Sequence, residues 1–303
     1  GKSSKSVEQY YSDLRTFFRY MLLVRGKAQP GIPFNKIDIS GVDTELVRSV
    51  TVSDLYGFMV YCKEELRNNT ATRARKTSTL RLFFKYMSVQ THRLESNPAD
   101  LLEAPKIKQS LPKYLSLEDS LELLNSVDGE NGRRDYCILT IFLNCGLRLS
   151  ELCGLNLSDI SSDGTMTVTG KGNKERMVYL NDSCKTAIKR YLEVRPHEGL
   201  PAESKNALFI SRNRKRISPR TVEHIVTSYI KKAGLDGKGL STHKLRHTAA
   251  TLMYRHGHVD IRVLKDILGH ANLGTTQIYT HVSDTQIKAA IDANPLSEVK
   301  SKK

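Results

Sequence analysis

The sequence predicts a mainly α-helical protein with two domains: an all-helical N-terminal domain and a mixed α/β C-terminal domain that holds a small antiparallel sheet. Three observations lead to this prediction. Apolar side chains recur at helical spacing through most of the chain, and clear strand patterns occur only between residues 165 and 211. A segment with two prolines and no periodicity separates the halves, so we place domains at residues 1–103 and 117–303 and a linker at 104–116.

The charge of the chain indicates a polyanionic partner. Lys and Arg number 47 against 32 Asp and Glu, which gives a formal net charge of +15. Nucleic acid is the commonest partner of such a protein, and an incidentally basic protein is the alternative. No apolar run is long enough to span a membrane, no secretory signal is recognisable and the five cysteines are expected to be reduced, so we expect a cytoplasmic protein that does not enter a membrane.

The N-terminal domain is predicted from apolar residues at spacings of three and four, with Gly-rich and Pro-rich segments between them. Its expected elements are a helix over 6–25, an irregular loop over 26–50, helices over 51–69 and 70–90, and a short helix opened by Asn97 and Pro98.

The helix over 70–90 carries an excess of positive charge. No acidic residue occurs between Glu65 and Glu95, and Arg73, Thr77, Arg81 and Lys85 repeat at every fourth position. This stripe lacks the intrahelical acids that usually neutralise a solvated face. We therefore predict contact with a DNA backbone, and a merely basic surface is the alternative. The residues predicted to bind are Arg73, Lys76, Arg81 and Lys85.

The C-terminal domain is predicted to combine helices with a hairpin. The strands TMTVTG (165–170) and RMVYL (176–180) flank a GKGNKE turn, and ALFIS (207–211) is expected to form a third short strand. The helix over 219–233 begins with Ser218 as its cap. The other expected helices lie near 117–127, 132–145, 182–194, 241–256, 260–268, 275–280 and 284–291.

One arginine, Arg148, lies within the apolar stretch 132–155. Burying an unpaired guanidinium is costly, so such a residue requires an acidic partner or an anionic ligand. Glu151 lies three residues further on, within reach on one helical turn. A structural arginine held by Glu151 and a phosphate-binding arginine both remain open on these residues.

A second cationic pair lies in THKLRHTAATLMYRHG. His243 and Arg246 are three residues apart and share a helix face, where a phosphate would satisfy both side chains. His243 and His247 also have the spacing of a zinc pair, but no third ligand is identified by the sequence. We therefore predict no metal site.

Three further residues are candidates through their local patterns. Gly269 is expected to end a helix with positive φ, which directs His270 onto a bend, and Tyr279 follows nine residues later. Lys171 lies between two glycines at the hairpin tip, in a sequence without the spacing of a P-loop. A packed tyrosine and a solvated turn lysine are the alternatives for Tyr279 and Lys171.

Four motifs, GLRLSEL, GKGNKERMVYL, HKLRHTAATLM and LGHANLGTTQIYTHV, occur in this order and together resemble the tyrosine recombinases, the phage-integrase family. The chain is most similar to the compact Xer-like members, and the match covers residues 113–291. The resemblance implies a two-domain DNA clamp. Residues 117–303 would form the catalytic domain, and residues 1–103 would form the helical core-binding (SAM-like) DNA-binding domain. The N-terminal domain resembles the family's only in size, helicity and basicity.

The resemblance also implies a catalytic set. It consists of Arg148, Lys171, His243, Arg246, His270 and Tyr279, with Glu151 at the supporting acidic position. In this family the tyrosine attacks DNA to leave a 3′-phosphotyrosine and a free 5′-hydroxyl, which then attacks the partner strand through a Holliday junction. Covalent attachment conserves the phosphodiester energy, so no ATP, metal or other cofactor is expected.

The residues fit this chemistry on physical grounds. Two guanidiniums and one or two imidazoles are suitable fixed donors for the charge that develops on the phosphate. His243 is the candidate base for the tyrosine and Lys171 the candidate acid for the leaving 5′-oxygen. A basic stretch over 211–220 is predicted to contact the same duplex through Arg212, Arg214, Lys215, Arg216 and Arg220.

The expected partner is double-stranded DNA with an inverted-repeat core site. A homo-tetramer on two DNA sites is expected from exchange of the C-terminal helix within residues 284–295, and we expect the protein to associate with the nucleoid. A partner recombinase, an accessory factor, and a role in chromosome resolution or in a mobile element all remain open. The alternatives are a type IB topoisomerase and a non-catalytic DNA-binding regulator, although every catalytic position is filled.

Overall fold

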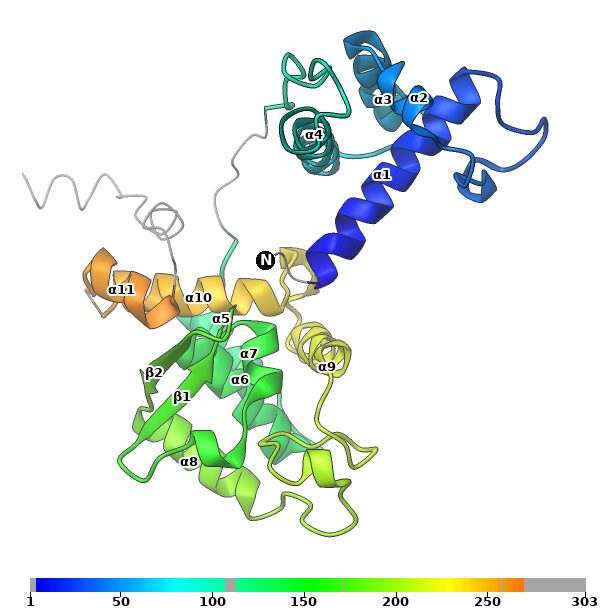
Figure 1. Ribbon diagram of the computed structural model, residues 1–303. Coiled ribbons are helices and arrows are strands. Elements are labelled where there is room, and N and C mark those ends of the chain that lie inside the picture. The colour runs from blue at the N-terminus through cyan, green and yellow to red at the C-terminus, as the bar shows by residue number, and fades with distance from the viewer. Residues whose placement is uncertain (1–3, 107–112, 171, 258, 270–303) are drawn as a thin grey trace, which may run out of the picture. The chain divides into compact units, whose positions relative to one another are not determined.

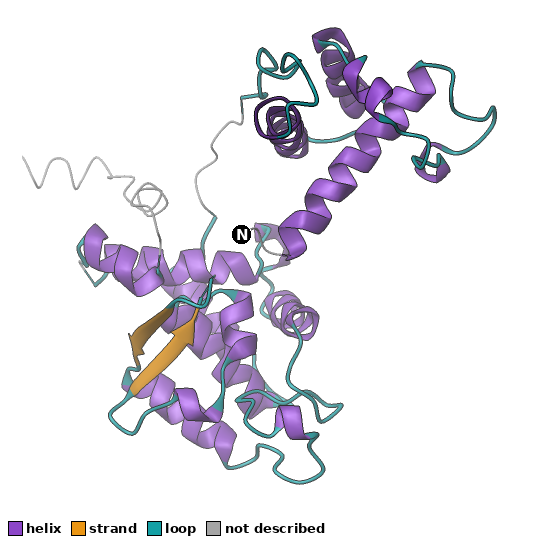
Figure 2. Cartoon of the chain, in the orientation of Figure 1, coloured by secondary structure: helices purple, strands orange, loops and turns teal. Residues whose placement is uncertain are grey.

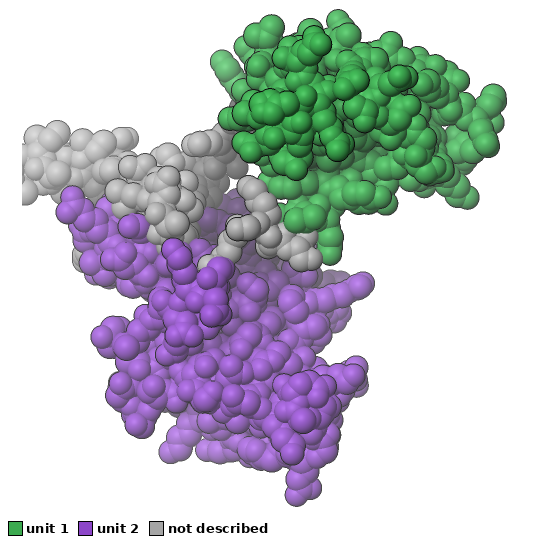
Figure 3. Space-filling view, in the orientation of Figure 1, with its two compact units in different colours: residues 1–110 green, residues 111–303 purple. Residues whose placement is uncertain are grey.

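The computed structural model describes residues 4–106, 113–170, 172–257 and 259–269. The chain divides into two compact units, residues 1–110 and 111–303 (Figure 3). Helices dominate both units, and the described residues hold one two-stranded antiparallel sheet (Figure 2). The predicted fold class is therefore confirmed.

Unit 1 is a helical domain built around three phenylalanines. The ring centroid of Phe17 lies 5.2 Å from that of Phe58 and 6.1 Å from that of Phe84, and all three side chains are fully buried. Edge-to-face contacts of this kind add to the stabilisation from apolar burial. The helices are α1 (Ser4–Val24), α2 (Thr44–Arg48), α3 (Val52–Glu64) and α4 (Thr70–Lys85), with a 3₁₀ turn at Phe34–Lys36 and a π-helical turn at Tyr86–Gln90.

Two expectations for this unit are wrong. Residues 26–50 are not irregular throughout, because Asp43 accepts a hydrogen bond from the Leu46 backbone and caps the short helix α2. The short helix expected at Asn97 is a turn. The Asn97 side chain accepts from the Ala99 backbone and donates to Asp100, and these local bonds compete with helix formation.

Unit 2 has the long helix α6 (Gly132–Cys145) at its centre. Ten of its residues are buried, and it packs against α8 (Asp182–Leu192) and α10 (Thr242–Arg255) (Figure 1). A helix that is buried on most of its surface organises the core of its domain. The remaining helices are α5 (Leu117–Asn125), α7 (Leu149–Gly154), α9 (Pro219–Lys232) and α11 (Ile261–Leu268), with 3₁₀ turns at Leu157–Asp159, Ala202–Ser204 and Asp236–Lys238.

The sheet is a hairpin of β1 (Thr165–Thr169) and β2 (Glu175–Tyr179), paired antiparallel with Thr165 opposite Tyr179. It contacts α7 through β1. The hairpin prediction is confirmed, and Gly170, which follows β1, lies close to Glu151 of α7.

The third strand expected at residues 207–211 is wrong. Ala207 and Ile210 form only isolated bridges, and the Leu208 backbone donates to Leu155 at 2.8 Å. The buried Arg195 guanidinium donates to the carbonyls of Ala207 and Leu208, which a neighbouring strand would otherwise use. The segment is buried and apolar, but its backbone groups form hydrogen bonds with separate partners and not with one continuous neighbouring strand.

The end of α11 confirms a local prediction. Gly269 caps the helix in the left-handed conformation, with φ of +63°. The helices expected at 275–280 and 284–291 lie outside the described residues. Within the described ranges, no helix combines the length and apolar character needed to cross a bilayer.

Candidate active site

The chain between α6 and α7 presents Arg148 at the edge of the core. Gly146 ends α6 with φ of +59°, and the reversal makes Arg148 the residue that precedes α7. Glu151 lies in the first turn of α7 and accepts a hydrogen bond from the Arg148 backbone nitrogen at 2.8 Å. The motif GLRLSEL therefore folds into a tight unit in which the glutamate caps its own helix.

The Glu151 carboxylate is the centre of a cluster of arginines. Its side chain is 1% exposed, and it accepts hydrogen bonds from Arg148 Nη1 at 2.6 Å and from Arg176 Nη1 and Nη2 at 3.0 and 2.9 Å. Arg246 Nη1 lies 3.8 Å from its Oε2. Burial by itself would raise the pKa of the carboxylate, but the hydrogen bonds from Arg176 and Arg148 outweigh it and lower the pKa from 4.5 to about 2. Glu151 is therefore ionised at neutral pH.

Arg176 is a residue that the sequence analysis missed. It lies on β2, where it shares the inward face with the buried Val178, and its side chain is 14% exposed. The signal was an arginine on the inward-facing side of an alternating strand, which requires an acidic partner. That partner, Glu151, lies 25 residues earlier.

The same three arginines hold the C-terminal end of α11. Helix ends leave carbonyls without intrahelical partners and carry partial negative charge, so cations are favourable there. Three consecutive carbonyls each accept from a different arginine. The bonds are Arg176 Nε to Ile267 (3.1 Å), Arg246 Nη2 to Leu268 (2.7 Å) and Arg148 Nη2 to Gly269 (3.1 Å).

Arg246 and His243 enter this region from α10. The Arg246 side chain is 3% exposed and also donates to the carbonyl of Gly146 at 2.6 Å. His243 is exposed, and its Nε2 lies 3.0 Å from Nε2 of His247. Partial desolvation of its ring and the positive charges of Lys244, Arg246 and Arg148 lower the pKa of His243 below 6.5. Its neutral form is therefore favoured at neutral pH.

The cluster of Arg148, Arg176, Arg246 and Glu151 carries a net charge of +2. Arg148 is the member that reaches solvent, with 38% of its side chain exposed. An excess of positive charge that opens to the surface at one guanidinium favours an anion at that point. Within the described ranges, no three His, Cys, Asp or Glu side chains gather as metal ligands.

Lys171, His270 and Tyr279 lie outside the described residues. Gly170 and Gly269, which precede Lys171 and His270 in the chain, are described, and both lie at the cluster. A Cβ on Gly170 would be 3.5 Å from Oε1 of Glu151. Gly269 is the residue whose carbonyl accepts from Arg148.

The predicted DNA-binding residues of α4 do not share one surface. The prediction of Lys76 as a DNA contact does not fit this geometry, because its side chain is 7% exposed, pairs with Asp13 at 3.6 Å and lies over the ring of Phe58. Thr77 is fully buried, which interrupts the expected stripe. Arg73 is half-buried, whereas Arg81 and Lys85 are exposed. Asp13, the acid that pairs with Lys76, comes from α1 and not from α4 itself.

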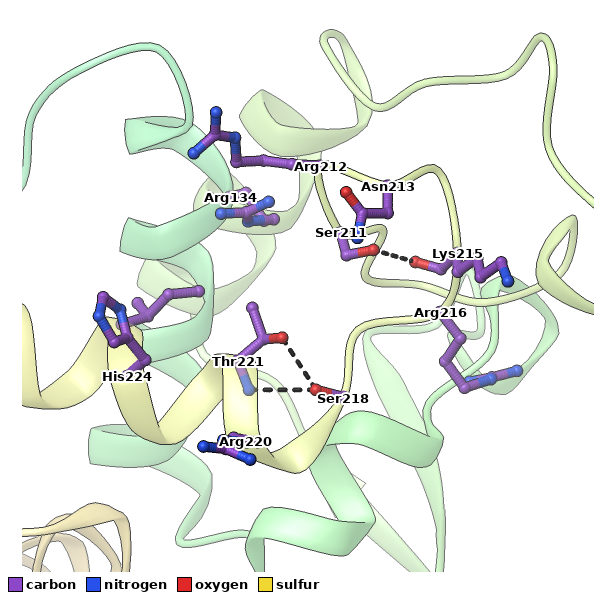
Figure 4. A pocket seen from close by; sticks show the side chains of 11 residues that line it. Arg134, Ser211, Arg212, Asn213, Lys215, Arg216, Ser218, Arg220, Thr221 and His224 are labelled. Atoms are coloured by element: carbon purple, nitrogen blue, oxygen red, sulfur yellow. Dashed lines mark hydrogen bonds between the residues drawn. The ribbon is translucent and has the colours of Figure 1, made fainter.

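The basic stretch 211–220 borders a pocket of about 750 Å³ at the N-terminal end of α9 (Figure 4). Arg212, Lys215 and Arg220 line it, and none of its lining residues is acidic. Arg214 instead donates to the Glu198 carbonyl at 2.7 Å.

Arg216 also lines this pocket, but it is anchored to protein. Its guanidinium has four acceptors within the unit, so its prediction as a DNA contact does not fit this geometry. The acceptors are the carbonyls of Cys153, Gly154 and Leu155 and Oδ1 of Asn156.

Comparisons with known proteins place this geometry in context. The model of the phage integrase family matches residues 113–286. The chain is 50% identical over 297 residues to the tyrosine recombinase XerC of Caldanaerobacter subterraneus subsp. tengcongensis, covering 98% of this chain and 83% of the relative.

Solved structures are similar as well. The crystal structure of XerA recombinase is 27% identical with a TM-score of 0.53, covering 99% of this chain and 94% of that one. The pre-cleavage complex of XerH site-specific recombinase bound to difH substrate is similar in fold, with 24% identity, a TM-score of 0.66 and coverage of 82% and 72%.

Proposed function

Because this chain belongs to the phage integrase family, as a Xer-like tyrosine site-specific recombinase, we propose that it cleaves and rejoins DNA through a 3′-phosphotyrosine formed by Tyr279 and a Holliday junction. The observation that carries this proposal is the net-positive cluster around Glu151, which opens to solvent at Arg148 beside His243.

The cluster suits a phosphodiester under attack. Negative charge grows on the nonbridging oxygens as the tyrosine oxygen approaches, and guanidiniums that are already oriented stabilise it without reorganisation. Glu151 restrains Arg148 through its side chain and its backbone nitrogen. Arg246 adds positive charge from a buried position. In this proposal the carboxylate serves to orient the arginines and does not contact the DNA.

Proton transfer completes the cleavage step. The phenol of Tyr279 must lose its proton as its oxygen bonds to phosphorus, and neutral His243 is the acceptor in this proposal. The lowered pKa of His243 supports this assignment, since a protonated imidazole accepts no proton. Lys171 then protonates the leaving 5′-oxygen, and His270 donates to the phosphate.

The substrate is duplex DNA with an inverted-repeat core site, contacted along its backbone by basic side chains of both units. The solved XerH relative is bound to its difH substrate, which supports DNA as the partner. The proposed contacts are Arg73, Arg81 and Lys85 in unit 1, which acts as the core-binding domain, and Arg212, Arg214, Lys215 and Arg220 in unit 2. A homo-tetramer joined by exchanged C-terminal helices would carry out strand exchange at the nucleoid.

A plasmid recombination assay tests this proposal. The protein first selects its site from a pool of randomised duplexes, and two copies of that site are placed on one supercoiled plasmid. We expect deletion or inversion between the sites by the natural protein and no exchange by Tyr279→Phe. Relaxation of supercoils without exchange, or no reaction at the selected site, would contradict the proposal.

A further inference from the structure

Arg176 makes contacts that are unusual for a strand residue. Its guanidinium donates two parallel hydrogen bonds, of 3.0 and 2.9 Å, to the Glu151 carboxylate. Its Nε donates a third hydrogen bond to the Ile267 carbonyl at 3.1 Å. Such a planar set of donors is available only to arginine, because lysine carries a single ammonium group. The side chain is thereby used to join β2, α7 and the end of α11.

These contacts bear directly on Arg148. The described side-chain acceptors of Arg148 are the Glu151 carboxylate and the Gly269 carbonyl. Arg176 holds the first of these acceptors directly and holds the second through Ile267, two residues before Gly269. Arg176 therefore contacts both elements that orient Arg148, which are α7 and the C-terminal end of α11.

Gly269 shows how closely Arg176 fits. A Cβ at this position would lie 3.0 Å from Cδ of Arg176 and 3.2 Å from its Nε and Nη1. The glycine φ of +63° is a conformation that other residues rarely adopt. The close approach thus requires glycine both for its backbone conformation and for the space that Arg176 occupies.

We infer that Arg176 is a positioning residue of the recombination reaction, which orients Arg148 for the phosphate by holding Glu151 and the C-terminal end of α11. This inference rests on the proposed function of Arg148. Arg176 itself does not contact DNA, because its side chain is 14% exposed and its donors are directed at protein acceptors. Its effect on the reaction passes through Arg148.

The test is a single-turnover cleavage assay on a nicked duplex that carries the selected site. Arg176→Lys keeps the positive charge but removes the two-pronged contact, and we expect the cleavage rate to fall by at least about tenfold. The dissociation constant for the same duplex should change by less than about twofold, since no DNA contact is lost. Arg190→Lys, at an exposed arginine on α8, is the control and should leave both quantities unchanged.

A double-mutant cycle separates positioning from a merely structural role. If Arg176 acts through Arg148, then Arg176→Lys should have little further effect on the cleavage rate in an Arg148→Lys background. Should the Arg176 variant fail to fold, Gly269→Ala displaces the Arg176 guanidinium while it keeps every charge, and it should slow cleavage in the same way.

Two results would overturn the inference. One is cleavage by Arg176→Lys at the rate of the natural protein. The other is that Arg176→Lys slows cleavage by the same factor in the Arg148→Lys background as in the natural protein. Failure of the natural protein to cleave the selected site would instead contradict the proposed function.

Discussion

Arg148 and Glu151 bind each other twice, through the Arg148 backbone nitrogen at 2.8 Å and its Nη1 at 2.6 Å. The pairing shows that a structural arginine and a phosphate-binding arginine are not exclusive interpretations of this residue. Glu151 holds one edge of the guanidinium, and 38% of the side chain stays exposed. A buried carboxylate thus fixes the direction in which the exposed part of the arginine points.

Replacement of Glu151 should alter how stability depends on pH. Its pKa in the folded protein is about 2, below the ordinary 4.5, so its contribution is present above pH 4.5 and is lost as pH falls towards 2. We expect the free energy of unfolding of the natural protein to fall by on the order of 3 kcal/mol more than that of Glu151→Gln over this range. Urea unfolding of the full chain near pH 7 and near pH 3 should already show about 2 kcal/mol of this difference. Equal losses in the two proteins would show that the carboxylate is not held by the arginines.

His243 should determine how the cleavage rate falls as the pH is lowered. Its pKa is lowered below 6.5, and the base is active only when neutral, so the rate should fall only at pH values below 6.5. The measurement is the cleavage rate against pH with the DNA well below saturation, which reports groups of the free protein. His243→Gln should lower the rate about 10²-fold or more and remove this acid limb. An acid limb centred above 6.5 would contradict the prediction.

In unit 1, Arg81 and Lys85 should contribute to the salt dependence of DNA binding, whereas Lys76 should not. Each phosphate contact adds about 0.9 to the slope of log K against log salt, so Arg81→Ala with Lys85→Ala should flatten the slope by about 2. Lys76→Met is the control: it removes one of the two cations that pair with buried Asp13, the other being Arg75, and should lower stability while the slope is unchanged. If Lys76→Met changed the salt slope and the Arg81→Ala, Lys85→Ala variant did not, the assignment of these roles would be contradicted.

Arg216 and Arg220 lie four residues apart, but their replacement should affect different properties. Loss of Arg216 should lower stability, whereas loss of Arg220 should weaken the salt dependence of DNA binding. Arg216→Ala removes the donors that satisfy the carbonyls at the end of α7 and should cost about 1–3 kcal/mol of stability. Arg220→Ala should change stability by less than about 0.5 kcal/mol and reduce the salt slope of binding by about 1. Thermal unfolding and binding titrations on both variants distinguish the two roles, and equal loss of stability would refute the distinction.

Local patterns predicted much of the fold. The start of α9 follows from Ser218, which accepts a hydrogen bond from Thr221, and from Pro219 in the first turn. The end of α11 follows from Gly269. These signals are reliable because the residues that make the contact are neighbours in the chain.

The errors arise from partners that are distant in sequence. The sequence around Lys76 shows no acid, because Asp13, which pairs with Lys76, comes from α1. Residues 207–211 looked like a strand because burial and apolar character do not reveal that Arg195 takes their carbonyls. Arg176 was missed for the same reason, since its role depends on the meeting of β2, α7 and α11.

The covalent intermediate provides the most direct test of the proposed chemistry. The protein is incubated with a nicked duplex that carries its selected site, and the products are separated in SDS and mapped by mass spectrometry of the peptide joined to DNA. We predict an SDS-resistant adduct through Tyr279 that is absent from Tyr279→Phe and strongly reduced in Arg148→Ala. An adduct that persists in Tyr279→Phe, or that forms as fast without Arg148, would contradict an active site built from this tyrosine and the arginine cluster.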